Sequence, residues 1–154
     1  MNILIQCFIT FIACVSISIH FNVKGKLLTY SALGGAITFF VYILSSPLNS
    51  VAMQSFVASI AASIYSESLA RIIKVPATTF LIISIIPLVP GSNLYYTMEL
   101  CINNEIMNFL TSALNTLGIA GAIALGILLV SSLFRFITAI RQIYAAKALH
   151  HKER

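Results

Sequence analysis

The chain carries very little charge. Of its 154 residues only 8% are charged and 59% are hydrophobic, and the mean hydropathy is +0.99. A typical soluble domain carries about 25% charged residues, so this composition excludes a soluble fold and predicts an integral membrane protein. The net charge of +5 does not indicate nucleic-acid binding, because the basic residues stand in short clusters beside apolar runs.

Other scarcities exclude whole classes of chemistry. The sequence has no Asp, no Trp and four Glu, so it cannot form an aspartate dyad. Its three Cys are an odd number and give no disulfide framework, and its three His show no metal-ligand spacing. No phosphate-binding loop or cofactor fingerprint occurs. We therefore expect no enzymatic activity, no cofactor, no metal and no use of ATP by this chain.

The apolar runs predict an all-α membrane bundle of five transmembrane helices, because each run is long enough to cross a hydrocarbon core about 30 Å thick. The predicted spans are 3–21, 27–44, 51–69, 76–98 and 113–136. They form a membrane domain of residues 1–140, followed by a basic cytoplasmic tail of residues 141–154. The polar stretch 99–112 is expected to be the longest link, an outer loop that can hold some helix.

The positions of the basic residues predict the orientation. From the N-terminus to the C-terminus, the segments outside the spans carry zero, two, zero, two, zero and five Lys or Arg residues, when Arg135 at the end of the fifth span is counted with the tail. By the positive-inside rule, this alternation predicts the N-terminus outside and the C-terminus inside.

The fourth predicted span is interrupted by the sequence Pro87-Leu88-Val89-Pro90-Gly91-Ser92. Each proline removes a backbone donor, Gly91 can adopt a positive φ, and Ser92 is a good N-cap for a restarted helix. Broken backbone at membrane depth survives only inside protein or beside a watery cavity. The break is therefore either a plain proline kink or a substrate site, where the N-terminus of the restarted helix suits a carboxylate.

Two further features concern the position of this break. Counting helical rise from Lys74 places it past the midplane, toward the outer side. Tyr95 follows one turn later, and it either belongs to an aromatic belt at the membrane interface or offers a hydroxyl group to a ligand.

The third predicted span has a polar face. Ser55, Ser59 and Ser63 recur at helical spacing, and the stripe ends near Glu67, with Arg71 four residues further on. Lipid would not accept such a stripe, so it must face protein or water. Glu67 and Arg71 either form an interfacial ion pair or act as a coupling or gating pair at the inner mouth.

Small residues predict close helix contacts in two other spans. Gly34 and Gly35 lie in the second span, and the fifth contains Gly118, Gly121 and Gly126. Glycines on one helical face allow backbones to approach closely in a membrane.

Three stretches together carry a resemblance to a known family. They are 21–23 (Phe-Asn-Val), 67–78 (Glu-Ser-Leu-Ala-Arg-Ile-Ile-Lys-Val-Pro-Ala-Thr) and 86–95, which reads Ile-Pro-Leu-Val-Pro-Gly-Ser-x-x-Tyr. The chain resembles the threonine/serine exporter family, in particular its small C-terminal-type (YjjB-like) component, over roughly residues 21–136. The resemblance places the family's signature turn on Pro87, Pro90, Gly91, Ser92 and Tyr95, and other recurrent positions on Asn22, Glu67, Arg71 and Pro76.

This resemblance implies a function. Members of the family occur as one long protein or as two chains, and they are associated with export of threonine and serine, or of succinate in some two-chain members. The chain is therefore expected to be a subunit of a gradient-driven exporter in the bacterial plasma membrane, working with a larger (YjjP-like) membrane subunit or as a homo-oligomer. The alternative is a structural subunit that assembles a membrane complex and transports nothing itself.

Overall fold

The computed structural model describes residues 3–152, with the side chains of residues 3–140, and this part of the chain is helical without any strand. Six α-helices and two short 3₁₀ helices follow one another along it. They are α1 (Ile3–His20), α2 (Lys26–Leu44), η1 (Ser46–Leu48), α3 (Val51–Ile73), α4 (Ala77–Ile85), η2 (Ile86–Leu88), α5 (Gly91–Ile102) and α6 (Ile106–Lys152).

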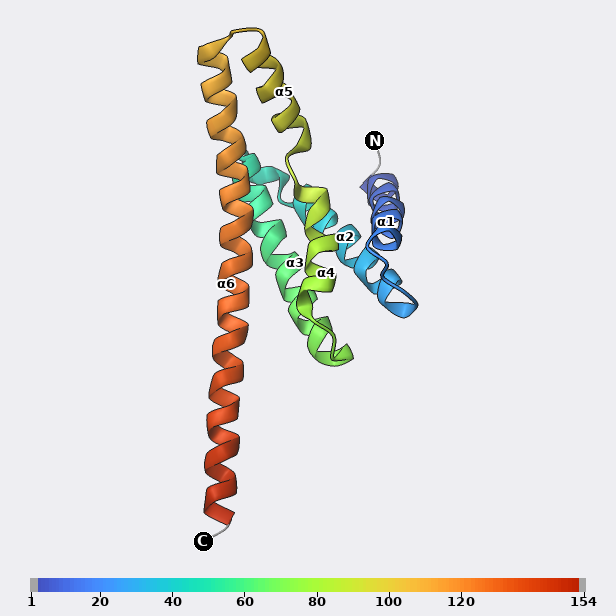
Figure 1. The fold of residues 1–154 in the computed structure, drawn as a ribbon, viewed down its shortest axis with the longest axis vertical. Coiled ribbons are helices and arrows are strands. Elements are labelled where there is room, and N and C mark those ends of the chain that lie inside the picture. The colour runs from blue at the N-terminus through green and yellow to red at the C-terminus, as the bar shows by residue number, and fades with distance from the viewer. Residues whose placement is uncertain (1–2, 153–154) are drawn as a thin grey trace.

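The helices form a bundle with α2, α3 and α4 at its centre. Helix α1 packs against α2 on one side and α6 packs along α3 on the other (Figure 1). Helices α1, α2, α3 and α6 are each long and apolar enough to cross a membrane, and the bent pair of α4 and α5 makes a fifth span if it counts as one. The predicted all-α membrane bundle is thus confirmed, with four or five spans.

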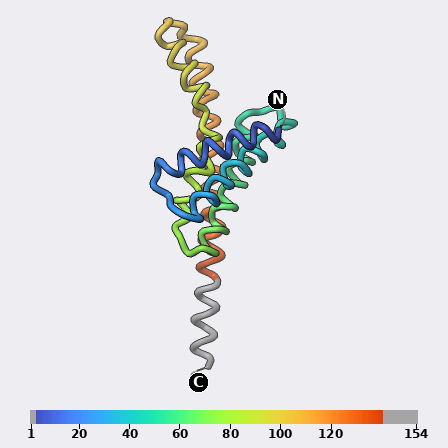
Figure 2. Tube along the Cα trace, turned by 90° about the vertical axis from the view of Figure 1, so that its right-hand side faces the viewer, coloured from blue at the N-terminus to red at the C-terminus, as the bar shows by residue number. Residues whose placement is uncertain are grey.

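The two ends of this bundle differ in charge. At one end, Ile3 shares a surface hollow with Ser46 and Pro47 of the α2–α3 link, so the start of α1 lies beside that link (Figure 2). At the other end, Phe21 and Thr78 share a hollow, which brings the α1–α2 link to the start of α4.

The basic residues gather at this second end. Lys24 and Lys26 lie in or beside the α1–α2 link, while Lys74 ends α3. Arg71 donates a hydrogen bond to the carbonyl of Phe134, which brings Arg135 to the same level. The Lys and Arg residues of the described side chains thus gather at one end of the bundle, as the positive-inside rule predicts for five spans.

The prediction of a long outer loop over residues 99–112 is wrong. Helix α5 continues to Ile102 and α6 begins at Ile106, so only three residues connect them. Asn104 makes the turn with a φ of 58°, a conformation that Asn tolerates better than most residues. Of the polar residues that suggested a loop, Glu99, Asn108 and Ser112 lie on α5 and α6, while residues 103–105 form the short turn between the two helices.

The two helices form a hairpin that extends beyond the rest of the bundle, at the end that carries the α2–α3 link (Figures 1 and 2). Helix α5 has 12 residues, a length of about 18 Å at 1.5 Å per residue. The helix that α5 chiefly packs against is α6. The hairpin is therefore a distinct feature that begins at the proline break.

Glycines bring several helices into close contact. A Cβ atom on Gly34 would collide with Ser84 of α4 and lie 2.8 Å from the ring of Tyr65 in α3, and one on Gly35 would collide with Cys14 of α1. The predicted close contacts of the second span are thus confirmed.

In the fifth span only one glycine serves this purpose. A Cβ atom on Gly126 would collide with Ser59 and lie 3.0 Å from the carbonyl oxygen of Phe56, both in α3. Gly118 and Gly121 face open space, so the prediction fails for these two positions. Helices α3 and α6 are thus in close contact at Gly126.

Candidate functional site

The break between α4 and α5 is a sequence of short, distinct conformations. After α4 the chain makes a 3₁₀ turn over Ile86–Leu88, Val89 is extended, and Pro90 precedes the first residue of α5. The two helical parts are bent by 55° relative to each other. This is a true interruption and a sharper change of direction than the gentle curvature of an ordinary long helix.

The break does not use the positive φ that Gly91 permits, and the prediction of Ser92 as the N-cap is wrong. Gly91 is the first residue of α5 and does not have a positive φ, which among the described glycines occurs only at Gly25. Pro90, not Ser92, occupies the N-cap position, and no side chain caps the helix. The reason is that the 3₁₀ turn and the extended Val89 already redirect the chain, so a left-handed residue is not needed.

The break lines a cavity of about 300 Å³. Its walls come from the ends of α2 and α3, from the break and the first turn of α5, and from α6; the lining residues are Tyr42, Val51, Ser55, Pro87, Leu88, Val89, Pro90, Ser92, Asn93 and Ile119. Because Tyr42 and Val51 flank the α2–α3 link, the cavity lies toward that end of the bundle. This agrees with the predicted position of the break beyond the midplane.

The polar groups of this cavity are uncharged. Its walls include the side chains of Tyr42, Ser55, Ser92 and Asn93, which offer hydroxyl and amide groups as donors and acceptors. At the start of α5 the N–H of Gly91 donates to the carbonyl of Val89 at 2.7 Å and that of Leu94 to the carbonyl of Pro90 at 3.0 Å, so the N–H groups of Ser92 and Asn93 are the ones left without a backbone partner in the described part of the chain. Together with the helix dipole, they favour a negatively charged group at this position.

The end of α4 below the break also contains unsatisfied polar groups. Pro87 has no N–H, so the carbonyl of Ile83, four residues earlier, loses its helical donor. That carbonyl instead accepts a long hydrogen bond from the thiol of Cys14 in α1, with 4.0 Å between sulfur and oxygen. The hydroxyls of Ser84 and of Ser31 in α2 are buried and have no hydrogen-bond partner in the described part of the chain. The segment next to the cavity is therefore less completely hydrogen-bonded than an ordinary membrane helix.

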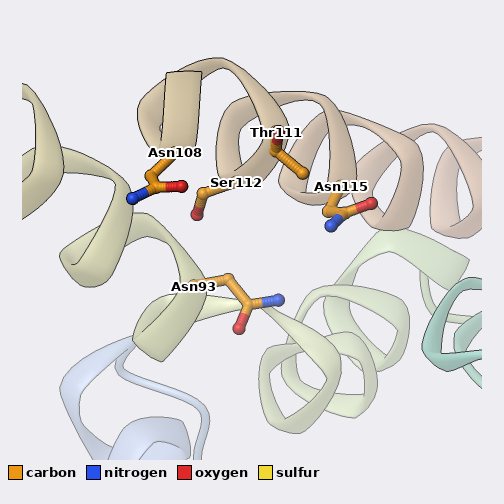
Figure 3. Close-up of a pocket in the computed structure, with 5 residues that line it drawn as sticks. All are labelled: Asn93, Asn108, Thr111, Ser112 and Asn115. Carbon is orange, nitrogen blue, oxygen red and sulfur yellow. The ribbon is translucent and has the colours of Figure 1, made fainter. Parts of the chain in front are cut away.

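A second hollow, of about 310 Å³, lies between α5 and the first turns of α6. It is lined by five uncharged polar residues, which Figure 3 shows on facing helices: Asn93, Asn108, Thr111, Ser112 and Asn115. Nearby, the hydroxyl of Thr97 lies 2.7 Å from that of Ser112 and 3.4 Å from that of Thr116, which ties α5 to α6. Asn93 lines both hollows, so the two adjoin each other.

The structure separates Tyr95 from the other residues of the signature turn. Pro87, Pro90 and Ser92 line the break cavity, and Gly91 is adjacent to them. Tyr95 is 67% exposed and lines a different surface hollow, together with Met98 and Glu99. Its ring packs edge-on against Tyr96, at 5.8 Å between centroids. Of the two interpretations of Tyr95, this position favours the interfacial aromatic one.

The serine stripe of α3 is buried, and most of it contacts protein. Ser55 is the only member that lines the break cavity, and Ser59 lies against Gly126. The hydroxyls of Ser63 and Ser66 donate to carbonyls one turn earlier in their own helix. The stripe therefore serves chiefly as a surface for close helix packing.

Glu67 and Arg71 lie at the opposite, basic end of the bundle. A guanidinium nitrogen of Arg71 is 4.0 Å from a carboxylate oxygen of Glu67, and the side chains are 39% and 21% exposed. Arg71 also donates to the carbonyl of Phe134 at 3.0 Å, and its guanidinium lies 4.9 Å from the centroid of that ring. The pair is thus linked to α6 and is far along the bundle from the break cavity.

Sequence reasoning missed Tyr42, Asn93 and Asn115 as lining residues. A signal for Asn115 was available, because Asn108, Ser112 and Asn115 recur at helical spacing. It was missed because residues 99–112, which contain the first two, were interpreted as a loop. Among the described residues, no group of three His, Cys, Asp or Glu is placed to hold a metal ion.

Comparison with known proteins identifies the family. The model of the family described as "Threonine/Serine exporter, ThrE" matches residues 6–133, which include the break, both hollows and the α3 stripe. Neither a curated protein nor a solved structure matches the chain. The chain is thus a multi-pass membrane protein with an exporter-type transport role, and it belongs to the threonine/serine exporter family.

Proposed function

We propose that this chain is one subunit of a gradient-driven exporter that moves small carboxylate-bearing metabolites out of the cell. The observation that carries the proposal is the cavity at the break, which is lined by Ser92 and Asn93, the two residues at the start of α5 whose N–H groups have no backbone partner among the described residues. A cavity of about 300 Å³ lies at the lower end of the range of small-molecule sites in proteins. Threonine, serine and succinate, the substrates that the family resemblance implies, are small enough to enter it.

The first turn of α5 binds the carboxylate in this proposal. Unpaired N–H groups at a helix start form hydrogen bonds to an anion without a charged side chain. Tyr42 and Ser55 then offer hydroxyls to the rest of the solute. No Lys or Arg occurs between Lys74 and Arg135, so a second carboxylate would need a cation from elsewhere.

A larger subunit of the same family completes the transport path. Many carriers place the site between paired structural repeats, whereas this chain has an odd number of predicted spans and no visible internal repeat. Helix α6 packs against α3 and α5 and leaves large apolar side chains exposed along its remaining sides, for example Leu125, Leu128 and Leu133. These sides are available to lipid and to the partner subunit.

The basic end of the bundle faces the cytoplasm of a bacterium, and the break cavity opens toward the outside. The positive-inside rule supports this orientation, because the described Lys and Arg residues gather at one end. Solute then enters from the cytoplasmic side and leaves past the α5–α6 hairpin.

The double substitution of Pro90→Leu and Ser92→Ala tests the proposal in the complex of this chain with the larger subunit. Leucine allows α4 and α5 to join into a more regular helix, which removes the unpaired N–H groups from the cavity. We expect export to fall at least tenfold while the complex still assembles. The control is Leu4→Ala, at a position that is 80% exposed on α1 and lies outside both hollows. Normal export by a correctly assembled double variant would support the structural-subunit alternative instead.

A further inference from the structure

The hollow between α5 and α6 differs from the break cavity in its chemistry. Its five lining residues are three asparagines, one threonine and one serine, with no apolar side chain (Figure 3). The break cavity, by contrast, is also lined by Val51, Leu88, Val89 and Ile119. An Asn amide offers two donors and one acceptor oxygen, so it can bind a carboxylate or an ammonium group.

The polar hollow is confined to one seam of the hairpin. Other positions of the same two helices expose large apolar side chains; Met98, Ile102, Met107 and Leu114 are each between 68% and 79% exposed. A hairpin selected only for solubility in water would distribute its polar groups over its outer surface. Three Asn side chains gathered at one seam indicate that the polar groups have a specific partner there.

The edge of this hollow is acidic. The side-chain nitrogen of Asn108 donates to a carboxylate oxygen of Glu105 at 2.7 Å. Glu99 is the other charged residue of the hairpin, since no Lys or Arg lies between residues 75 and 134. Such an edge attracts an amine and repels a solute that carries net negative charge.

We propose that the hollow is a second, outer binding station of the exporter, which takes small solutes that bear an amine and have no net negative charge. It shares Asn93 with the break cavity, so the second station lies next to the first. Asn115 and Ser112 bind the carboxylate of the solute, and the amide oxygen of Asn108 together with Glu105 binds its amine. This inference rests on the proposed transport function and adds a second binding site to it.

The test measures binding from the outside. Right-side-out membrane vesicles that contain the complex with the larger subunit are given external radiolabelled L-threonine, and bound label is measured under conditions in which no gradient drives transport. Asn108→Leu combined with Asn115→Leu removes two amides from the hollow, and we expect at least tenfold weaker binding. Leu114→Ala is the control, because this exposed side chain lies in the same turn but does not line the hollow. Unlabelled L-serine is expected to displace the label at least tenfold better than succinate does.

The break variant separates this inference from the proposed function. With Pro90→Leu and Ser92→Ala, transport is expected to stop while external L-threonine still binds at the outer station. Unchanged binding in the Asn108 and Asn115 double variant would overturn the inference, and so would equal displacement by succinate. A wild-type complex that exports threonine but binds none from outside would also overturn it, without affecting the proposed function.

A milder substitution covers the case in which the double variant does not assemble. Thr111→Val keeps the shape of the side chain and removes its hydroxyl, so we expect about threefold weaker external binding of L-threonine. No change in binding by Thr111→Val would count against the outer station in the same way.

Discussion

Gly126 of α6 lies directly against Ser59 of α3, and this contact fixes the distance between the two helices. A Cβ atom at this position would overlap the serine hydroxyl and approach the backbone carbonyl of Phe56 to 3.0 Å. The serine hydroxyl cannot easily turn away, because it donates to that carbonyl at 2.7 Å. The carbonyl of Phe56 cannot move unless the whole helix shifts, so only glycine fits at position 126 in this arrangement.

Gly126→Ala is therefore expected to destabilise the protein by about 1–3 kcal/mol, the usual range for overpacking. Gly118→Ala is the matched control, because nothing lies within 4 Å of the Cβ atom that it adds. Alanine favours a helix over glycine, so the control is expected to stabilise by about 0.5–1 kcal/mol. Thermal unfolding of the two variants in the same detergent measures the difference, and equal effects would contradict the close contact.

The second prediction concerns Arg71, which holds the basic ends of α3 and α6 together. Its guanidinium donates to the carbonyl of Phe134 and also lies over that ring. Lysine keeps the charge but cannot match the planar, multidentate geometry of arginine. We expect Arg71→Lys to destabilise by about 1 kcal/mol and Arg71→Met to destabilise more. Retention of wild-type thermal stability by Arg71→Met would show that the link to α6 contributes nothing.

The third prediction separates two roles for Glu67. As one member of an ion pair at 4.0 Å with a partly exposed Arg71, it is worth only a few tenths of a kcal/mol to stability. Glu67→Gln is thus expected to leave assembly and unfolding temperature almost unchanged. Export by the assembled complex, measured with and without a proton gradient, then decides the role. Export that stays normal and gradient-dependent assigns Glu67 to structure, whereas loss of gradient dependence assigns it to coupling.

The fourth prediction concerns Tyr95, which the structure places outside both hollows. Tyr95→Phe removes its hydroxyl and keeps the ring that packs against Tyr96. We expect export in the assembled complex to change less than twofold. Ser92→Ala is the comparison, because it removes a hydroxyl that does line the break cavity. A larger loss from Tyr95→Phe than from Ser92→Ala would reverse the assignment of the site.

The elements that composition determines were predictable from the sequence. Long apolar runs specify membrane helices, since hydrocarbon leaves the backbone few other choices. The two prolines located the break, and helical rise from Lys74 placed it at the correct end of the bundle.

Local geometry at the break could not be predicted in the same way. Gly91 permits a positive φ without requiring one, and the 3₁₀ turn at Ile86–Leu88 made that conformation unnecessary. Pro90 took the N-cap position that Ser92 also suits by residue type, because the choice depends on where the extended segment ends.

The hairpin was missed for a related reason. The polar residues between Glu99 and Ser112 suggest a loop in a sequence that is otherwise apolar. Their partners across α5 and α6 could only be identified once the fold was known, as with Thr97 and Ser112. Contacts between helices depend on the rotation of each helix, which a single sequence specifies weakly.

The most direct test of the central claim measures metabolite release from cells that express this chain alone, the larger subunit alone, or both. Threonine, serine and succinate are followed in the medium and compared with their cytoplasmic pools. The account predicts release of an amino acid only when both chains are present, and loss of that release with Pro90→Leu and Ser92→Ala. The account would be contradicted if the release of all three metabolites were the same with and without this chain. It would also be contradicted if the break variant, in a complex shown to be assembled, released them as the wild-type chain does.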